Sequence, residues 1–311
     1  MASLRDIKRK IRVVKNISQI TQAMKMVAAA KLRRVQERVQ RGKPYAQTMA
    51  ELVGTLAPNV RDFAHPLLDT RPVGAIGIVV IAADKGLSGS YNSNILRLAH
   101  QFVDRKTREV ESSGREHLNG RQPVRIVTVG RKATDYFTKR GYPVVQNYPS
   151  LGAQTPYDQV RAASNMITGM FMTGQVDEVY ICYTEFVTTM TQRPHSIKFL
   201  PIERPAETAD SPVGANAAAT GGTGRRDFIF EPAAPELLSR LLPRFVETRI
   251  YQLLLESAAS QLGAQMTAMT NATKNAGDQI ENLTLLANRT RQAGITKELL
   301  DIVGGAEALK G

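Results

Sequence analysis

The sequence of 311 residues contains a single cysteine, Cys182. One cysteine excludes an intramolecular disulfide and any zinc site built from several cysteines. Long apolar runs are also missing, since the longest, around residues 76–83, is far shorter than the roughly 20 residues of a membrane-spanning helix. The start of the chain lacks the apolar core and cleavage site of a signal peptide. We therefore expect a protein that lies in the cytoplasm or peripherally on a membrane.

Recognisable catalytic and metal-binding patterns are missing as well. The four histidines are scattered without the spacing of metal ligands, and no close carboxylate pair stands at the end of a predicted strand. The loop Asp84–Ser90 (DKGLSGS) lies between a predicted strand and a predicted helix, where phosphate-binding loops occur. Its glycines match neither GxGxxG nor GxxxxGK[ST]. We interpret Gly86 and Gly89 as turn residues, and we expect no catalytic residue, no metal and no cofactor.

Positive charge is concentrated near the start of the chain. The net charge is +13, and residues 1–57 contain 13 Lys and Arg against 3 Asp and Glu. Residues 234–311 contain eight of each and are neutral. A basic segment implies an acidic partner, and nucleic acid, anionic lipid and an acidic protein surface all qualify.

Both ends of the chain show the periodicity of long helices. Ser3 and Asp6 have the spacing of a capping box. Apolar residues then follow in steps of three and four, as on one side of a helix: Leu4, Ile7, Ile11, Val14, Ile17, Ile20, Met24 and Val27. We expect Gly42 and Pro44 to bend this helix. If it is continuous, residues 3–57 span roughly 80 Å.

The second long helix has a stricter repeat. Steps of four and three alternate over about four and a half heptads, which is typical of a left-handed coiled coil: Leu262, Met266, Met269, Thr273, Ala276, Ile280, Leu283, Ala287, Thr290 and Gly294. The small residues allow close approach but bury little apolar area, so such a coil would gain from surrounding protein. Amphipathic helices packed on a globular core give a similar pattern, but typical helices have about 11–12 residues. The sequence therefore favours an antiparallel intramolecular coiled coil.

The middle of the chain alternates strands and helices, which predicts a Rossmann-like α/β domain with a mainly parallel five-stranded sheet. Strands are expected at 75–82, 124–129, 144–148, 178–186 and 196–202, and helices at 90–110, 134–140 and 157–173. Only a short turn separates the last two strands, so that edge is expected to be antiparallel. Residues 203–226 are rich in Ala, Gly, Thr and Pro and predict a flexible loop. The predicted divisions are thus 1–57, 58–233 and 234–311.

Four segments resemble the gamma subunit of F-type ATP synthases, and the resemblance covers nearly the whole chain. They are ISQITQAMKMVAAAK at 17–31, ADKGLSGSYN at 83–92, YTEFV at 183–187 and ITKELLDIVGGA at 295–306, the most specific of the four. The resemblance implies a coiled-coil rotor shaft inside a hexamer of alpha and beta subunits. Such a shaft is not an enzyme by itself, and it couples proton or sodium flow to ATP synthesis or hydrolysis. It also implies a bacterial protein, peripheral on the cytoplasmic face of the plasma membrane.

The resemblance further implies contact residues. Arg291 and Gln292 match a pair that binds a catch loop of one beta subunit, and Thr296 and Glu298 lie on the same surface. Met24 and Lys25 match the region that faces the acidic lever of a beta subunit. The segment with Phe228, Phe230 and Glu231 resembles the foot, which touches the membrane c-ring and the epsilon subunit.

Gln265 departs from the family pattern, because many members carry an arginine there, and the regulatory cysteine pair of the chloroplast form is absent. Two other classes stay open on the residues alone. A basic coiled-coil nucleic-acid-binding protein would explain the charge, although the chain lacks a recognised nucleic-acid-binding fold. A nucleotide-dependent enzyme would use the α/β domain, although the phosphate fingerprint is missing.

Overall fold

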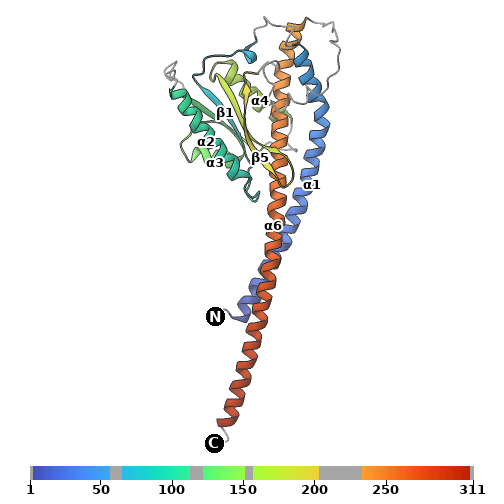
Figure 1. Ribbon diagram of the computed structural model, residues 1–311, viewed down its shortest axis with the longest axis vertical. Helices are drawn as coiled ribbons and strands as arrows, with labels where there is room; N and C mark the ends of the chain where they lie inside the picture. The colour runs from blue at the N-terminus through green and yellow to red at the C-terminus, as the bar shows by residue number, and fades with distance from the viewer. Residues whose placement is uncertain (1–2, 57–64, 113–121, 151–156, 203–232, 309–311) are drawn as a thin grey trace. The chain divides into compact units, whose positions relative to one another are not determined.

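The computed structural model describes residues 3–56, 65–112, 122–150, 157–202 and 233–308 (Figure 1). The chain forms two compact units. The helical unit contains residues 1–30 and 265–311, and the sheet unit contains residues 31–264. Because the boundary falls inside both terminal helices, the three-part division expected from the sequence stays a prediction.

Two long helices form the ends of the chain. Helix α1 spans Leu4–Leu56 and helix α6 spans Ala234–Ala308. One half of the predicted capping box is present, because the backbone N–H of Asp6 donates to Ser3 Oγ at 3.2 Å. The Asp6 carboxylate accepts from the hydroxyl of Ser3, at 2.8 Å, in place of its backbone N–H. Helix α1 does not end at Pro44, which lies inside it. Among the described residues, no helix combines the length and apolarity needed to cross a bilayer.

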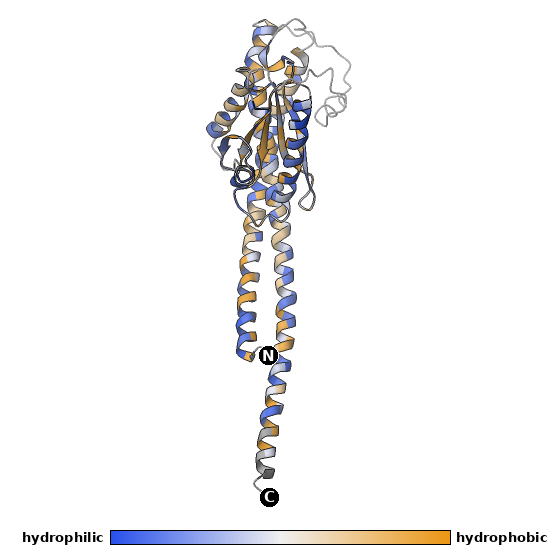
Figure 2. Ribbon diagram, turned by 90° about the vertical axis from the view of Figure 1, so that its left-hand side faces the viewer, coloured by the Kyte–Doolittle hydropathy of each residue, from blue (hydrophilic) through white to orange (hydrophobic). Residues whose placement is uncertain are grey.

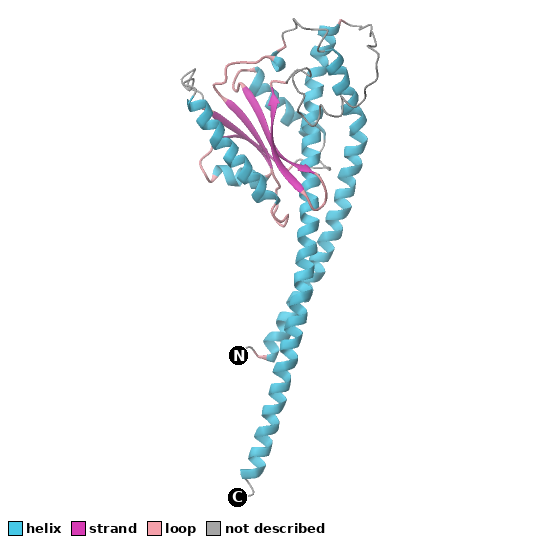
Figure 3. Cartoon of the chain, in the orientation of Figure 1, coloured by secondary structure: helices cyan, strands magenta, loops and turns pink. Residues whose placement is uncertain are grey.

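The described part of the sheet unit contains one five-stranded sheet in the order β3-β2-β1-β4-β5. Its strands are drawn in magenta in Figure 3. The strands are β1 (Ile76–Ile81), β2 (Val124–Val129), β3 (Val144–Tyr148), β4 (Glu178–Phe186) and β5 (Gln192–Leu200). The helices between them are α2 (Tyr91–Ser112), α3 (Arg131–Thr138) and α4 (Tyr157–Met172), with a short 3-10 turn, η2 (Pro66–Leu68), before β1. Strands β1 to β4 pair in parallel, and β5 pairs antiparallel with β4. The predicted fold class is confirmed, although β5 begins at Gln192 and not at Ser196.

Both faces of the sheet are covered, which explains the unbroken apolar sequence of β1. All six of its residues are buried. Because side chains alternate along a strand, Ile78 and Val80 pack into one core, which α2 and α3 complete. Val79 and Ile81 pack into the other, to which α4 and α6 contribute.

Candidate functional site

The two helical segments of the helical unit pack through a narrow stripe of partly small residues. On α6 the least exposed positions coincide with the predicted heptad seam from Met266 to Thr290, whereas Gly294 is exposed. On α1 the stripe also follows alternating steps of three and four: Leu4, Ile7, Ile11, Val14, Ser18, Thr21, Lys25 and Ala28. Thr21 Oγ1 and Thr273 Oγ1 lie 2.7 Å apart across the pair. The predicted coiled coil is therefore present, with polar and small residues at its centre.

The predicted stripe of α1 is correct only as far as Val14. Ile17, Ile20 and Val27 were expected in the seam, but 46%, 58% and 54% of their surfaces are exposed. Together with Val13 and Met24 they form a second apolar stripe at positions 13, 17, 20, 24 and 27. This second stripe lies about 100° around the helix from the seam, since its members precede seam residues by one position. Helix α1 therefore presents exposed apolar side chains outside its seam with α6. Figure 2 shows orange, hydrophobic residues interspersed with blue, hydrophilic ones along the long helices.

The last turns of α6 are also exposed. Every residue from Arg291 to Leu300 is exposed. Several of them are large and apolar, as are two residues that follow: Ile295, Leu299, Leu300, Ile302 and Val303. Apolar residues rarely gather on the surface of a monomeric protein without a partner to cover them.

Charge in the helical unit is unevenly distributed between its helices. Residues 1–30 contain seven Lys and Arg against one acidic residue, Asp6. Six of the seven are exposed, and Lys25 is half-buried. Asp6 pairs with Arg9 at 3.2 Å. The outer side of α1 thus combines a basic surface with an apolar stripe.

The predicted contact residues fall into two groups. Met24 and Lys25 are half-buried on α1, three and four residues beyond Thr21, which is level with Thr273. Arg291, Gln292, Thr296 and Glu298 are exposed on α6. The groups are separated by roughly 30 Å along the helix axis, at about 1.5 Å per residue. Within the described part of the chain, Arg291 and Gln292 make no side-chain hydrogen bond or ion pair, so both are available to a partner.

The remaining predicted contact residues, Phe228, Phe230 and Glu231, lie outside the described residues, as does the predicted loop 203–226. Their roles, like those of the six residues on α1 and α6, stay predictions. The sequence analysis did not predict the exposed second stripe: it left out Val13 and assigned the other exposed members to the seam. Their signal was present in the sequence, because their spacing is itself a heptad pattern.

The loop from Asp84 to Ser90 is held by its own side chains. The Asp84 carboxylate accepts hydrogen bonds from the backbone N–H groups of Arg131, at 2.9 Å, and Ser150, at 3.0 Å. Arg131 is the first residue of α3, so an aspartate already occupies the helix end that would attract an anion. Asn92 Oδ1 accepts from the N–H of Ala83 at 3.1 Å. These contacts support the interpretation of this segment as a turn.

Helix α6 covers the sheet at its switch point, the place between β1 and β4 where doubly wound sheets commonly bind ligands. Tyr91, at the start of α2, bonds to Ser257 with 2.9 Å between their hydroxyl oxygens. Ser260 donates to the carbonyl of Thr184 on β4 at 2.9 Å. Burial raises the pKa of Tyr91 to about 12, although the hydroxyls of Ser257 and Thr184 partly offset this. These contacts hold the part of α6 that belongs to the sheet unit against the sheet, at the place where an enzyme of this fold would hold its substrate.

Other reactive groups lie in structural positions. Cys182 is fully buried on β4, and burial raises the pKa of its thiol to about 12, which makes it a poor nucleophile. The part of the chain that the structure describes holds no group of three or more His, Cys, Asp or Glu side chains able to bind a metal ion.

Comparison with known proteins identifies the family. A family model described as ATP synthase matches residues 3–309. The ATP synthase gamma chain of Desulfitobacterium hafniense is 43% identical over 310 residues, which cover all of both chains. The gamma chain of Symbiobacterium thermophilum is 43% identical over 307 residues, or 98% of each chain. The chain belongs to the ATP synthase gamma-chain family. The assignment made from the four motifs is thereby confirmed, and the nucleic-acid-binding alternative is not favoured.

Two solved structures agree with the architecture. A chain in the Euglena gracilis mitochondrial ATP synthase (OSCP/F1/c-ring, rotational state 3) matches with a TM-score of 0.62 and 19% identity, covering 98% of this chain and 94% of that one. A chain from the central stalk and c-ring of the Tetrahymena thermophila enzyme matches with a TM-score of 0.53 and 23% identity, covering 81% and 99%. At these identities the likeness establishes the fold.

Proposed function

We propose that the chain is the central rotor shaft of a bacterial F-type ATP synthase. It transmits rotation of the membrane ring to the three catalytic beta subunits and so couples ion flow to ATP synthesis or hydrolysis. The observation that carries the proposal is the second apolar stripe on α1, at positions 13, 17, 20, 24 and 27, together with the exposed apolar end of α6. A helical pair that keeps apolar side chains outside its own seam is suited to a surrounding protein.

The shaft acts by contact and carries out no chemistry itself. The outer side of α1 presents a basic surface and an apolar stripe, and the end of α6 presents a further group of exposed apolar side chains. As it turns, each beta subunit meets a different face, and the difference in contact free energy shifts the populations of its conformations. Many weak contacts suit such a surface better than a few strong ones, because the surface must slide.

The two groups of predicted contact residues have separate roles in this mechanism. Met24 and Lys25 contact an acidic segment of a beta subunit, to which the seven basic residues of the first 30 contribute long-range attraction. Arg291 and Gln292 bind a loop of one beta subunit, and Thr296 and Glu298 complete that surface. Phe228, Phe230 and Glu231 contact the epsilon subunit and the c-ring, which keeps the chain peripheral on the cytoplasmic face of the membrane.

The experiment that tests the proposal is a titration of purified alpha and beta subunits with the full chain, followed by ATP hydrolysis. We expect hydrolysis to rise and to saturate at one copy of the chain per alpha–beta hexamer. Absence of binding and of stimulation with the cognate subunits would contradict the proposal. In that case a steep loss of DNA affinity with increasing salt would support the nucleic-acid-binding alternative.

A further inference from the structure

The turn between β4 and β5, residues 187–191, carries the most exposed large apolar side chain of the described residues. Met190 is 82% exposed, and Val187 in the same turn is exposed as well. We call residues 187–191 the hairpin tip. Single exposed apolar residues are common on protein surfaces, so the significance of Met190 depends on how the tip is held.

The hairpin tip is held by its own hydrogen bonds. The backbone N–H of Thr188 donates to the carbonyl oxygen of Thr191 at 3.0 Å. In return, Thr188 Oγ1 accepts from the backbone N–H groups of Met190, at 3.2 Å, and Thr191, at 3.0 Å. The side-chain amide of Gln192 donates to the carbonyl oxygens of Thr188 and Thr189, at 3.2 and 2.8 Å. An ordered turn therefore holds Met190 out in solvent.

Helix α6 supports the hairpin tip from behind. A Cβ built on Gly263 of α6 would lie 3.1 Å from the ring of Phe186 and 3.5 Å from the Cα of Thr189. The absence of a side chain at Gly263 thus lets α6 pack directly against the end of the hairpin. Phe186 and Leu262 also pack on an apolar cluster formed by Leu32, Val35, Leu255 and Ala259.

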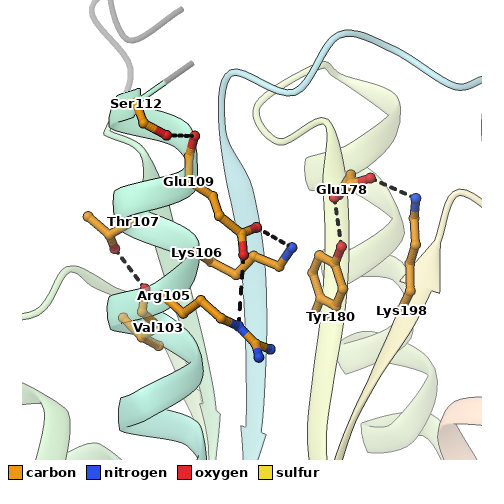
Figure 4. Close-up of polar contacts among 9 residues, drawn as sticks. All are labelled: Val103, Arg105, Lys106, Thr107, Glu109, Ser112, Glu178, Tyr180 and Lys198. Atoms are coloured by element: carbon orange, nitrogen blue, oxygen red, sulfur yellow. Dashed lines mark hydrogen bonds and ion pairs between the residues drawn. The ribbon is translucent and has the colours of Figure 1, made fainter. Parts of the chain in front are cut away.

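The other end of the hairpin is fixed by polar contacts. Glu178, the first residue of β4, binds Lys198 Nζ at 2.6 Å and accepts a hydrogen bond from the hydroxyl of Tyr180 at 2.9 Å (Figure 4). Because both ends of the hairpin are held, little conformational entropy would be lost when the tip meets a partner.

The position and charge of the hairpin tip limit the kind of partner. Helix α6 runs without a break past Gly263 and enters the helical unit at Gln265, so a protein that surrounds the helical unit along α6 comes beside the tip. Residues 187–193 contain an exposed cation, Arg193, and no acidic residue. The preceding carboxylate, Glu185, already lies 3.0 Å from His195 Nε2. This surface fits an apolar pocket with an acidic rim.

We propose that the hairpin tip docks on the beta subunits, with Met190 in an apolar pocket and Arg193 against its acidic rim. The inference rests on the proposed function, in which acidic beta subunits surround the helical unit. It gives the sheet unit a contact of its own, separate from those of Met24 and Lys25 and of the end of α6. An ordered tip suits a shaft that meets three beta subunits in turn, because it need not be ordered again at each contact.

Oxidation of methionine by hydrogen peroxide tests the docking, in the full chain alone and in the chain assembled with alpha and beta subunits. Peroxide transfers one oxygen atom to the thioether sulfur and leaves as water. We expect the rate at Met190 to fall about fivefold or more on assembly, because an enclosed sulfur is shielded from the reagent. Met172, which is more than half exposed at the end of α4, is the control, and its rate should change by less than about twofold. No Lys or Arg lies between these two residues, so trypsin releases them on one peptide for tandem mass spectrometry.

Met26 reports separately on the shaft. It is more than half exposed on α1, next to Val27 of the second stripe, so assembly should also protect it. Protection of Met26 without protection of Met190 would reject the docking of the tip and leave the shaft in place. Protection of neither would reject both. Equal protection of Met172 and Met190 would also overturn the docking, because the effect would not be local to the tip.

Variants of the hairpin tip test its contribution to assembly. Met190→Gln should raise the concentration of chain that half-stimulates ATP hydrolysis by about tenfold, because an apolar side chain is lost from its pocket. Met172→Gln is the matched control and should change this concentration by less than about twofold. Thr188→Val removes the oxygen that orders the turn and should weaken assembly, whereas Thr188→Ser keeps it and should behave as the wild type. Wild-type stimulation by Met190→Gln would overturn the proposal.

Discussion

Thr21 and Thr273 place their Oγ1 atoms 2.7 Å apart in the seam of the helical unit. Thr21 Oγ1 also lies 3.0 Å from the carbonyl oxygen of Ser18, and Thr273 Oγ1 lies 2.8 Å from that of Met269. Both hydroxyls are therefore satisfied although Thr21 is buried. A polar pair inside a seam fixes the alignment of two helices at some cost in stability, because other alignments would leave it unpaired.

Replacing one member of this pair should destabilise the helical unit. We expect Thr21→Val to lower the free energy of unfolding by about 1 kcal/mol, because the hydroxyl of Thr273 then loses its cross-helix partner. Thr21→Val combined with Thr273→Val should cost less than the sum of the single changes. Urea unfolding of the four proteins in a double-mutant cycle measures this coupling. Additive effects would show that the two hydroxyls do not interact.

The sequence predicted the sheet closely and the seam of α1 only in part. Buried strands such as β1 give unbroken apolar runs between glycines and turns, so their bounds were nearly correct. On α1, apolarity selected Ile11, Val14, Ile17 and Ile20, in successive steps of three. Each such step falls short of a full turn by about 60°, so Ile11 and Ile20 lie on opposite sides of the helix. Packing instead selected Ser18 and Thr21, because the close approach of α6 favours small residues.

The predicted contact residues could not be found by an argument from residue chemistry alone. Arg291 and Gln292 are an exposed cation and an exposed amide on a helix surface, which is where most such residues lie. Only the resemblance of the segment 295–306 beside them predicted a role. By contrast, the second apolar stripe of α1 could have been found from spacing alone, if two heptad patterns had been sought on one helix.

Changes in the second stripe should weaken assembly while leaving the free chain folded. We expect Ile20→Gln with Val27→Gln to change the free energy of unfolding by less than about 0.5 kcal/mol, because both side chains are exposed. The concentration that half-stimulates ATP hydrolysis should rise by about tenfold or more, since an enclosed apolar side chain contributes about 1.5–3 kcal/mol.

A variant of a seam residue, unlike the stripe variant, should destabilise the free chain. Ala28 is 1% exposed, so Ala28→Gln should destabilise the free chain by about 1–3 kcal/mol through crowding and burial of an amide. If the stripe variant unfolds as readily as the seam variant, the second stripe is part of the fold and not an interaction surface.

The end of α6 offers a test of the predicted contact pair. Arg291→Ala with Gln292→Ala should raise the half-stimulating concentration about tenfold or lower the maximal rate, because a charge-assisted contact to a beta subunit contributes about 1.5–3 kcal/mol. Lys297→Ala is the matched control, an exposed cation on the same helix outside the predicted contact set. Its effect should stay below about twofold, as for an exposed charge. If the two variants had equal effects, Arg291 would contribute only its positive charge and no specific contact.

Gly130 should be intolerant of any side chain. Its φ is +96°, and a Cβ built on it would lie 2.1 Å from the carbonyl oxygen of Ala82. Because backbone atoms on both sides would have to move, we expect Gly130→Ala to cost several kcal/mol, roughly 3 or more, in the free energy of unfolding. Gly141 has a φ of +75° with nothing within 4 Å of a built Cβ, so Gly141→Ala should cost about 1 kcal/mol. Thermal unfolding measures both variants. The loss in Gly141→Ala reports the backbone strain of a positive φ, and the additional loss in Gly130→Ala reports the steric clash with the carbonyl oxygen of Ala82.

Glu256, a half-buried residue of α6, should make global stability depend on pH. Burial and the charge of Glu185 raise the pKa of its carboxyl from 4.5 to about 7 in the folded chain, so the folded state holds a proton that the unfolded state has released. Its contribution to stability is therefore largest below 4.5, falls as pH rises, and is lost above about 7. Glu256→Gln should consequently be more stable than the wild type at about pH 8, by on the order of 1–2 kcal/mol after allowance for solvent screening. The difference should shrink toward pH 5, where the wild-type carboxyl is already protonated. Urea unfolding at both pH values measures it, and a variant that is less stable at high pH would mean that the ionised carboxylate is held by an attractive partner.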